Sequence, residues 1–362
     1  MSELQPLPRP TGGAAFAPFD PTDDAMWEAE VAIRAASYPD APPSIQALRH
    51  EESQWDSARH WRTRVIAHDI ADGRPVAYVQ VGHLPWLHHP QRYGVTAMVL
   101  PDARGRGIGG AILEWVEATV AARGGTVIRA EAKADDVRTL AIAAARGYAD
   151  RQQNWESRLD VAAFDEATFA PHDERVHADG IAICTLAELC AGAPDPAAEE
   201  SILAEYYALD VDATEDEPSL FPITPAPYLT WRAFAVEGPE ALPDATFLAL
   251  VPASGGETDT VAVGTTSGAR HKIVGLSALF QNLGLPGVLT QGFTAVARGY
   301  RGRGIAHALK RRTVAYARAH GYREIRTWNN SRNAPMLRIN EAMGFAKQPA
   351  WITLVKEMGM AT

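Results

Sequence analysis

Apolar residues along this chain gather in short runs that alternate with longer stretches of helical periodicity. Two runs are typical of buried strands, VTAMVL at 95–100 and FTAVA at 293–297. Each is followed by a loop rich in glycine and arginine, and then by an amphipathic pattern that predicts a helix, roughly over 107–123 and 304–320. The chain therefore contains two strand–loop–helix units.

These two units are copies of one segment. RGRGIGGAI at 104–112 returns as RGRGIAHAL at 301–309, an offset of 197 (301 − 104). The same offset aligns Gly124 with Gly321, which are suited to end the two helices, and Gly147-Tyr148 with Gly344-Phe345. Because the register holds without a gap, the sequence predicts two copies of a domain-sized unit.

The rest of the pattern completes an α/β fold class with two domains. Further strands are predicted over 62–70, 75–82, 126–132, 154–161, 246–251, 272–280, 324–328 and 350–358, and helices over 24–36 and 198–208. We expect domains over 1–165 and 178–362, with a polar, proline-broken boundary at 162–180. Residues 181–186 read as the first strand of the second copy. The acidic run 210–219 is expected to be a solvated loop or to lie over a site.

Composition changes this picture little. The 362 residues suffice for two cores, and 46% hydrophobic with 22% charged residues is typical of a globular protein. The formal net charge of −10 argues against general nucleic-acid binding. Two cysteines, Cys184 and Cys190, are too few for a disulfide framework, which favours a reducing, cytoplasmic setting. No apolar run approaches eighteen residues and no export signal is evident, so we expect no membrane segment.

The glycine loops predict a binding site for an anion. Each follows a strand and opens a helix, where unpaired backbone N–H groups and the helix dipole favour negative charge. The first loop matches the dinucleotide pattern G-x-G-x-x-G through Gly105, Gly107 and Gly110, but the second copy has His307 where the third glycine would be. No lysine–serine pair follows either loop, which disfavours a nucleotide hydrolase.

What both copies share is R-x-x-G-x-G/A, preceded by an apolar strand and followed about forty residues later by GY or GF. This pattern resembles the GNAT superfamily of N-acetyltransferases, and the layout is similar to tandem members such as mycothiol synthase-like proteins. The resemblance is closest in TAVARGYRGRGIAHALKRR and IRTWNNSRNAPMLRINEAMGF. It implies two domains, each a mixed, splayed central sheet flanked by helices, that bind acetyl-CoA at the loop and in the splay.

Carried over by position, the resemblance implies coenzyme-binding residues in both copies. In the second copy these are Ala295, Val296, Ala297, Arg301, Gly302, Arg303, Gly304, Ile305, Ala306 and Asn333. In the first copy they are Met98, Val99, Arg104, Gly105, Arg106, Gly107, Ile108 and Gly109. The first copy has Asp135 and Asp136 where the second has Arg332 and Asn333, so we expect the second copy to be the catalytic one.

The chemistry requires an N–H to stabilise the oxyanion, a base for the amine and an acid for the thiolate. We expect the backbone N–H near Val296 to serve the oxyanion, with Thr294 beside the reaction point. Many GNAT enzymes place a tyrosine five positions before the GF phenylalanine. Here that position holds Asn340, and Ala143 in the first copy, which leaves the acid unassigned. Candidates for substrate contact are Trp328, Asn329, Tyr206 and Tyr207, with Asp210 as a further candidate on the same wall.

The remaining motifs favour simpler interpretations. His83, His88 and His89 are interrupted by proline and lack a neighbouring cysteine or carboxylate pair, so no metal site is expected. The arginines around 298–312 suit coenzyme phosphates better than nucleic acid. The sequence thus predicts a monomeric N-acetyltransferase that acts on a primary amine of a small molecule or peptide. Two alternatives stay open: a non-catalytic acyl-CoA-binding protein, or a transferase for a larger donor.

Overall fold

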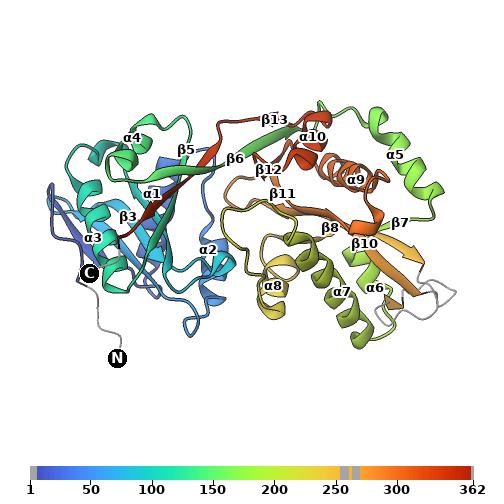
Figure 1. Cartoon of the computed structure of the whole chain (residues 1–362), viewed down its shortest axis with the longest axis horizontal. Coiled ribbons are helices and arrows are strands. Elements are labelled where there is room, and N and C mark those ends of the chain that lie inside the picture. The colour runs from blue at the N-terminus through green and yellow to red at the C-terminus, as the bar shows by residue number, and fades with distance from the viewer. Residues whose placement is uncertain (1–5, 253–260, 263–269, 360–362) are drawn as a thin grey trace.

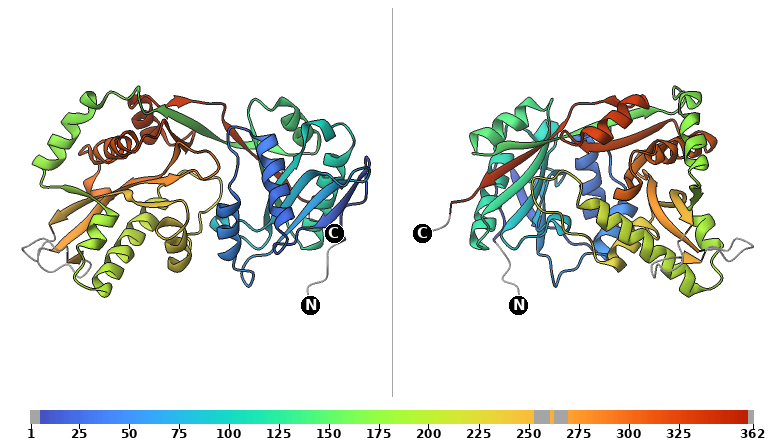
Figure 2. Two further views of the ribbon diagram at one scale, coloured as in Figure 1. Left: turned by 180° about the vertical axis from the view of Figure 1, so that it is seen from behind. Right: turned by 45° about the vertical axis from the view of Figure 1, so that its right-hand side comes forward.

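The two copies of the repeat form two lobes that share one continuous sheet, as a computed structural model of the chain shows (Figure 1, Figure 2). The structure describes residues 6–252, 261–262 and 270–359. Within these residues the sheet has fourteen strands. Twelve follow the order β1-β2-β3-β4-β5-β14-β6-β12-β11-β10-β8-β7, while β13 pairs with β6 and β9 pairs with β10. The predicted mixed α/β class is confirmed.

The first lobe comprises the elements up to β6. Its strands are β1 (Ala14–Pro18), β2 (Arg62–Asp69), β3 (Pro75–Gly82), β4 (Arg92–Val99), β5 (Val127–Lys133) and β6 (Ala149–Asp160). Its helices are α1 (Asp24–Ser37), α2 (Ile45–Ser53), α3 (Ile108–Ala122) and α4 (Val137–Ala145), with short 3-10 turns η1 (Pro85–Leu87) and η2 (Pro101–Ala103). The predicted strand, loop and helix of the first copy are all present.

The second copy of the repeat, from α5 onward, follows the same order. Its strands are β7 (Ala182–Thr185), β8 (Ala241–Pro252), β9 (Val261–Ala262), β10 (Arg270–Gln281), β11 (Val288–Val296), β12 (Glu324–Asn330), β13 (Ala346–Lys347) and β14 (Trp351–Glu357). Its helices are α5 (Glu166–Ala178), α6 (Leu186–Ala191), α7 (Pro196–Thr214), α8 (Tyr228–Ala235), α9 (Ile305–Ala319) and α10 (Ala334–Ala342), with η3 at Arg298–Tyr300. Gly124 and Gly321 follow the ends of α3 and α9 with φ of 69° and 73°, as expected for helix-ending glycines.

The last strand of the second copy is built into the first lobe. β14 lies between β5 and β6 and pairs antiparallel with both, while the other end of β6 pairs with β12 of the second lobe. Figure 1 shows β6 and β14 crossing together between the lobes. Ile352 and Leu354 of β14 are buried in the core of the first lobe, together with Ile128 and Val116. The two copies are therefore interlocked through shared strands.

Two segments differ from their predicted form. The boundary 162–180 is largely helical, because Phe169 and Val176 of α5 are buried and Arg311 of α9 forms ion pairs with Glu166 and Asp173. The acidic run 210–219 is a loop only in its second part. Its first part ends α7, since Ala213 continues the buried face of that helix. The prediction of a loop was wrong for 210–214.

Both copies have the expected splay. β4 and β5 pair in parallel only between Arg92–Gly94 and Val127–Arg129. β11 and β12 pair only between Val288–Thr290 and Glu324–Arg326. Beyond these three-residue ladders the strands separate, and a cavity lies at each splay.

Candidate active site

Each glycine loop brings a helix N-terminus to the open end of a splay. Gly107 and Gly304 are the N-caps of α3 and α9, with φ of 87° and 85°. Gly105 and Gly302 also have positive φ, at 83° and 78°. A side chain is strained in this left-handed region, so glycine allows the turn that aims the helix N–H groups outward. Both loops therefore have the backbone of an anion site.

The strand before each loop presents equivalent backbone groups to the splay. The N–H groups of Leu100 and Ala297 donate to the neighbouring strand, to the carbonyls of Val76 and Val274, each at 2.9 Å. Because polar groups alternate along a strand, those of the preceding residues, Val99 and Val296, face the opposite way, toward the splay. Their carbonyls accept hydrogen bonds from the loop arginines, Val99 from Arg104 Nε at 3.0 Å and Val296 from Arg301 Nε at 2.9 Å.

The first cavity is the larger of the two, about 740 Å³. A Cβ added at Gly105 would meet no described atom within 4 Å, as at its counterpart Gly302, and one added at Gly107 would meet Thr11 Cγ2 at 3.2 Å. Arg106 turns away from the cavity and pairs with Asp69 at 2.7 Å. The other predicted residues of the first copy all line the cavity: Met98, Val99, Arg104, Gly105, Gly107, Ile108 and Gly109.

Ionisable and aromatic side chains line the same cavity from α1, β5 and β14. Tyr38, the C-cap of α1, packs against Trp351 of β14 with ring centroids 5.0 Å apart. Burial raises the pKa of the Tyr38 phenol to about 12. Glu131 of β5 accepts a hydrogen bond from Arg129 at 2.7 Å and is 39% exposed. The cavity thus holds a proton donor and a carboxylate at the end of the splayed strands.

At the second cavity, about 500 Å³, Arg301 of the loop is already in an ion pair. Asp216, in the loop after α7, accepts hydrogen bonds from Arg301 at 2.6 Å and from Arg298 at 3.0 Å. These contacts hold the pKa of Asp216 at about 2. His172 of α5 approaches the loop as well: a Cβ added at Gly304 would meet its Nδ1 at 3.0 Å. The second part of the acidic run therefore lies beside this cavity, through Asp216 and Glu217.

Most predicted residues of the second copy lie around this cavity, and Glu217 and Tyr300 also line it. Asn333 caps α10 by accepting from the Met336 N–H at 3.3 Å. Asp136 caps α4 in the same way, through Thr139 at 3.0 Å. Of the predicted residues, the wall includes Thr294, Ala295, Val296, Arg301, Gly302, Gly304, Ile305, Ala306 and Asn333, but not Ala297 and Arg303.

Several candidates from the sequence lie elsewhere. Tyr206 is buried against Trp231, and Tyr207 donates to the carbonyl of Ala226 at 2.6 Å. Asn329 accepts a hydrogen bond from buried Asn340 at 2.7 Å. Trp328 is 38% exposed. In the described part of the chain, the walls of the two cavities do not include Tyr206, Tyr207, Trp328 or Asn329.

Thr294, on the wall of the second cavity, belongs to a buried hydrogen-bond network. Its hydroxyl lies 2.9 Å from that of Ser277, and Gln291 donates to Ser277 at 3.2 Å. Gln291 Oε1 in turn accepts from Thr313 at 3.2 Å and lies 3.5 Å from the Nζ of Lys310. This network pairs buried polar groups in the core of the second lobe.

The family follows from a profile match. The profile described as Acetyltransferase (GNAT) family matches residues 24–148 and 225–345, which together make up more than half of the chain. The chain belongs to the GNAT family. As a family member it is an acyltransferase of the N-acetyltransferase type, with two GNAT domains in tandem. The resemblance noted in the sequence is confirmed.

Solved structures share this fold over nearly the whole chain. A tandem GNAT protein from the clavulanic acid biosynthesis pathway is 19% identical with a TM-score of 0.67, covering 96% of this chain and 100% of its own. A GCN5-related N-acetyltransferase from Sphaerobacter thermophilus is 20% identical, with a TM-score of 0.62 and 95% of both chains covered. Saccharomyces cerevisiae N-myristoyltransferase, solved with bound myristoyl-CoA, is 9% identical with a TM-score of 0.57, covering 98% and 80%. A search of curated proteins gives no match.

Sequence reasoning missed Tyr38, Glu131 and the pairing of Asp216 with Arg301. For Glu131 a signal existed, because the 197-residue offset aligns it with Trp328, which was singled out in the second copy. Tyr38 reaches the cavity only through the packing of α1, which no local pattern reveals. In the part of the chain that is described, no helix combines the length and the apolar character needed to span a bilayer.

Proposed function

We propose that this GNAT protein transfers the acetyl group of acetyl-CoA to a primary amine, and that the first cleft is its main coenzyme site. The observation that carries the proposal is the contrast between the two loops. In the first, Arg104 lies at a helix N-terminus beside the larger cavity. In the second, Arg301 is paired with Asp216, so a pyrophosphate there has to displace a carboxylate.

Side chains on the acceptor side favour the same cleft. Glu131 and Trp328 occupy equivalent positions on β5 and β12, at the offset of 197. A carboxylate attracts an ammonium group and can accept its proton, whereas an indole cannot. Glu131 lines the first cavity together with Tyr38. The first cleft thus offers a carboxylate on β5 and a half-buried phenol at the end of α1, whereas the corresponding groups on the wall of the second cleft are Glu217 and Tyr300.

Each residue of the first cleft would have its own role in acetyl transfer. Bound acetyl-CoA supplies a thioester as the acyl donor. The N–H of Val99, which faces the splay, stabilises negative charge on the carbonyl oxygen as the amine attacks. Glu131 binds the ammonium form of the acceptor and accepts its proton. Tyr38, protonated at neutral pH, donates a proton to the leaving thiolate.

A pair of matched substitutions tests this assignment. Glutamate at Gly107 or Gly304 places a side chain and a negative charge at the N-cap of α3 or α9. We expect Gly107→Glu to abolish thiol release from acetyl-CoA over a panel of amines, and Gly304→Glu to leave most of the activity. Calorimetric titration with coenzyme A counts the sites in each variant.

The opposite pattern would restore the expectation from sequence that the second copy is catalytic. Coenzyme binding without turnover for any amine would instead favour the non-catalytic alternative. Circular dichroism of both variants separates these outcomes from misfolding.

A further inference from the structure

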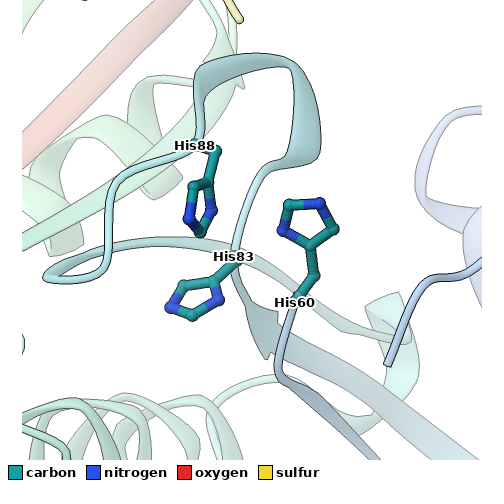
Figure 3. A group of neighbouring side chains, drawn as sticks. All are labelled: His60, His83 and His88. Atoms are coloured by element: carbon teal, nitrogen blue, oxygen red, sulfur yellow. The ribbon is translucent and has the colours of Figure 1, made fainter. Parts of the chain in front are cut away.

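Three histidines from separate segments meet in the first lobe, and one of them, His83, also lines the first cavity. His60 precedes β2, His83 follows β3 and His88 follows the short turn η1. One ring nitrogen from each lies within 4.8 Å of the other two. Figure 3 shows the three rings turned toward a common space. Only His83 and His88 are neighbours in sequence, so the group is a product of the fold.

The rings leave buried nitrogen atoms without partners. Nδ1 of His60, Nε2 of His83 and Nδ1 of His88 are buried and make no hydrogen bond of normal geometry with the described residues. Buried polar atoms are nearly always paired, so three orphans in one cluster call for an explanation. Ring centroids are 4.7 Å apart for His60 and His88 and 5.2 Å for His83 and His88.

The environment favours the neutral form of the rings. Burial lowers the pKa of His60, and the neighbouring His88 lowers it further. Burial likewise lowers the pKa of His83, against the opposing effect of the Pro90 carbonyl. Neutral imidazole is the form that binds metals. A set of three nitrogens without a carboxylate suits Zn²⁺ or a neighbouring transition metal, not Mg²⁺ or Ca²⁺.

We propose that His60, His83 and His88 bind one Zn²⁺ ion, with water at the fourth position. Three histidines and an open position form a known tetrahedral zinc arrangement, with Zn–N bonds of about 2.0–2.1 Å. The ring nitrogens, now within 4.8 Å of one another, would have to move closer together to reach this geometry. The site adjoins the first cavity through His83 but uses none of the glycine-loop residues, and it does not rest on the proposed function.

One hydrogen bond determines how tightly we expect zinc to bind. The Trp61 N–H donates to Nδ1 of His83 at 3.1 Å. Zinc bound at Nε2 requires the ring proton on Nδ1, and zinc bound at Nδ1 displaces the amide, so this hydrogen bond is lost on binding in either case. We therefore expect an affinity weaker than that of a structural zinc finger, with a dissociation constant on the order of micromolar.

The position of the site gives it a role in shaping the first cleft. A zinc ion there would tie the start of β2 to the connection between β3 and β4. That connection carries Trp86, which lines the first cavity and lies 5.3 Å from the guanidinium of Arg129. The ion would thereby fix the position of the cavity wall that carries Trp86.

Metal binding can be measured directly on the whole chain, purified without a histidine tag. Zn²⁺ titration followed by calorimetry and elemental analysis is expected to give about one equivalent per chain. Co²⁺, used as a coloured substitute, is expected to show the visible absorption of a tetrahedral site. A Cys184→Ser, Cys190→Ser background removes the chain's two free thiols from the readout.

Histidine variants assign the ligands. His60→Gln and His88→Gln should each weaken Zn²⁺ binding at least tenfold and abolish the Co²⁺ spectrum. His89→Gln is the matched control, because His89 is adjacent but outside the cluster and only accepts a hydrogen bond from the Gln91 N–H. Circular dichroism confirms folding of each variant. Equal zinc binding by wild type and by the His60, His88 double variant, or no binding by wild type at about 100 μM Zn²⁺, overturns the proposal.

Discussion

Asp216 holds the guanidinium of Arg301, accepting a hydrogen bond from Nη2 at 2.6 Å while Nε of the same arginine donates to the Val296 carbonyl. The loop after α7 thus pairs its own carboxylate with Arg301, the glycine-loop arginine that could otherwise bind an anionic ligand. The equivalent arginine of the first copy, Arg104, makes the same contact with the strand carbonyl, and its described contacts include no such carboxylate. Among the described ion pairs each loop thus has one paired arginine, but a different one: Arg301 in the second copy and Arg106, paired with Asp69, in the first.

Removing the Asp216 carboxylate should strengthen the binding of coenzyme A in the second cleft. In a Gly107→Glu chain, where the first loop is blocked, Asp216→Asn is expected to tighten coenzyme A binding roughly fivefold, since exposed ion pairs contribute up to about 1 kcal/mol. The pairing persists throughout the usable pH range because it holds the pKa of Asp216 at about 2. Calorimetry at low and high salt measures the effect, which salt should reduce.

Glu215→Gln is the control for this experiment, since Glu215 contacts Arg298 at 3.5 Å and makes no described contact with Arg301. If both substitutions changed affinity equally, general charge would explain the result instead of the Asp216 contact.

The role assigned to Tyr38 predicts a defined pH behaviour. Tyr38→Phe removes the proton donor and should lower kcat by roughly 100-fold, with the KM for acetyl-CoA nearly unchanged. Burial raises the pKa of Tyr38 to about 12, so the phenol stays protonated between pH 6 and 10. The ratio of wild-type to variant rates should therefore be constant over that range. Steady-state thiol release at several pH values checks it.

Tyr316→Phe serves as the comparison, because this tyrosine lies on α9 in the other lobe, stacked against His320. Full activity of the Tyr38→Phe enzyme would mean that solvent, and not Tyr38, protonates the leaving thiolate.

The strand and helix pattern predicted most of the fold because each element depends on its own residues. The repeat offset also placed the loops and the helix-ending glycines correctly, and it aligned Asp136 with Asn333, which cap equivalent helices. What local patterns cannot reveal is the partner of a strand: residues 350–358 read equally well whether β14 completes its own copy or the other. The same limit applies to His60, which lies 23 residues from His83 in the chain and beside it in the fold.

The shared strand predicts that a mutation in the second copy weakens the first lobe. Leu354 of β14 is 4% exposed and lies in the core with Ile128 and Val116. Leu354→Ala should lower the free energy of unfolding by about 2–5 kcal/mol and weaken coenzyme binding in the first cleft. Leu229→Ala, at a residue 74% exposed, should change it by less than about 0.5 kcal/mol. Urea unfolding followed by fluorescence and circular dichroism provides the comparison, and equal effects would argue against the interlocked core.

Buried Lys310 gives the stability of the second lobe a distinctive pH dependence. Its side chain is 1% exposed, with Nζ 3.5 Å from Gln291 Oε1 and 4.9 Å from the Phe345 ring, and burial lowers its pKa to about 7. Between that value and its ordinary pKa of 10.5, the unfolded chain binds a proton that the folded chain does not. Stability from this group is therefore complete above pH 10.5 and is lost as the pH falls to about 7.

Lys310→Met should remove this dependence. Methionine has a similar volume and no charge, so the variant should be more stable than wild type at pH 7, by an amount on the order of a few kcal/mol, and the difference should shrink steadily toward pH 10. Urea unfolding at pH 7, 8, 9 and 10 gives the two curves. Lys347→Met, at a residue whose side chain is 37% exposed and paired with Glu341, should leave the slope unchanged. A Lys310→Met chain that kept the wild-type slope would mean that water or a local opening hydrates the amine, because only a desolvated lysine couples folding to protonation in this range.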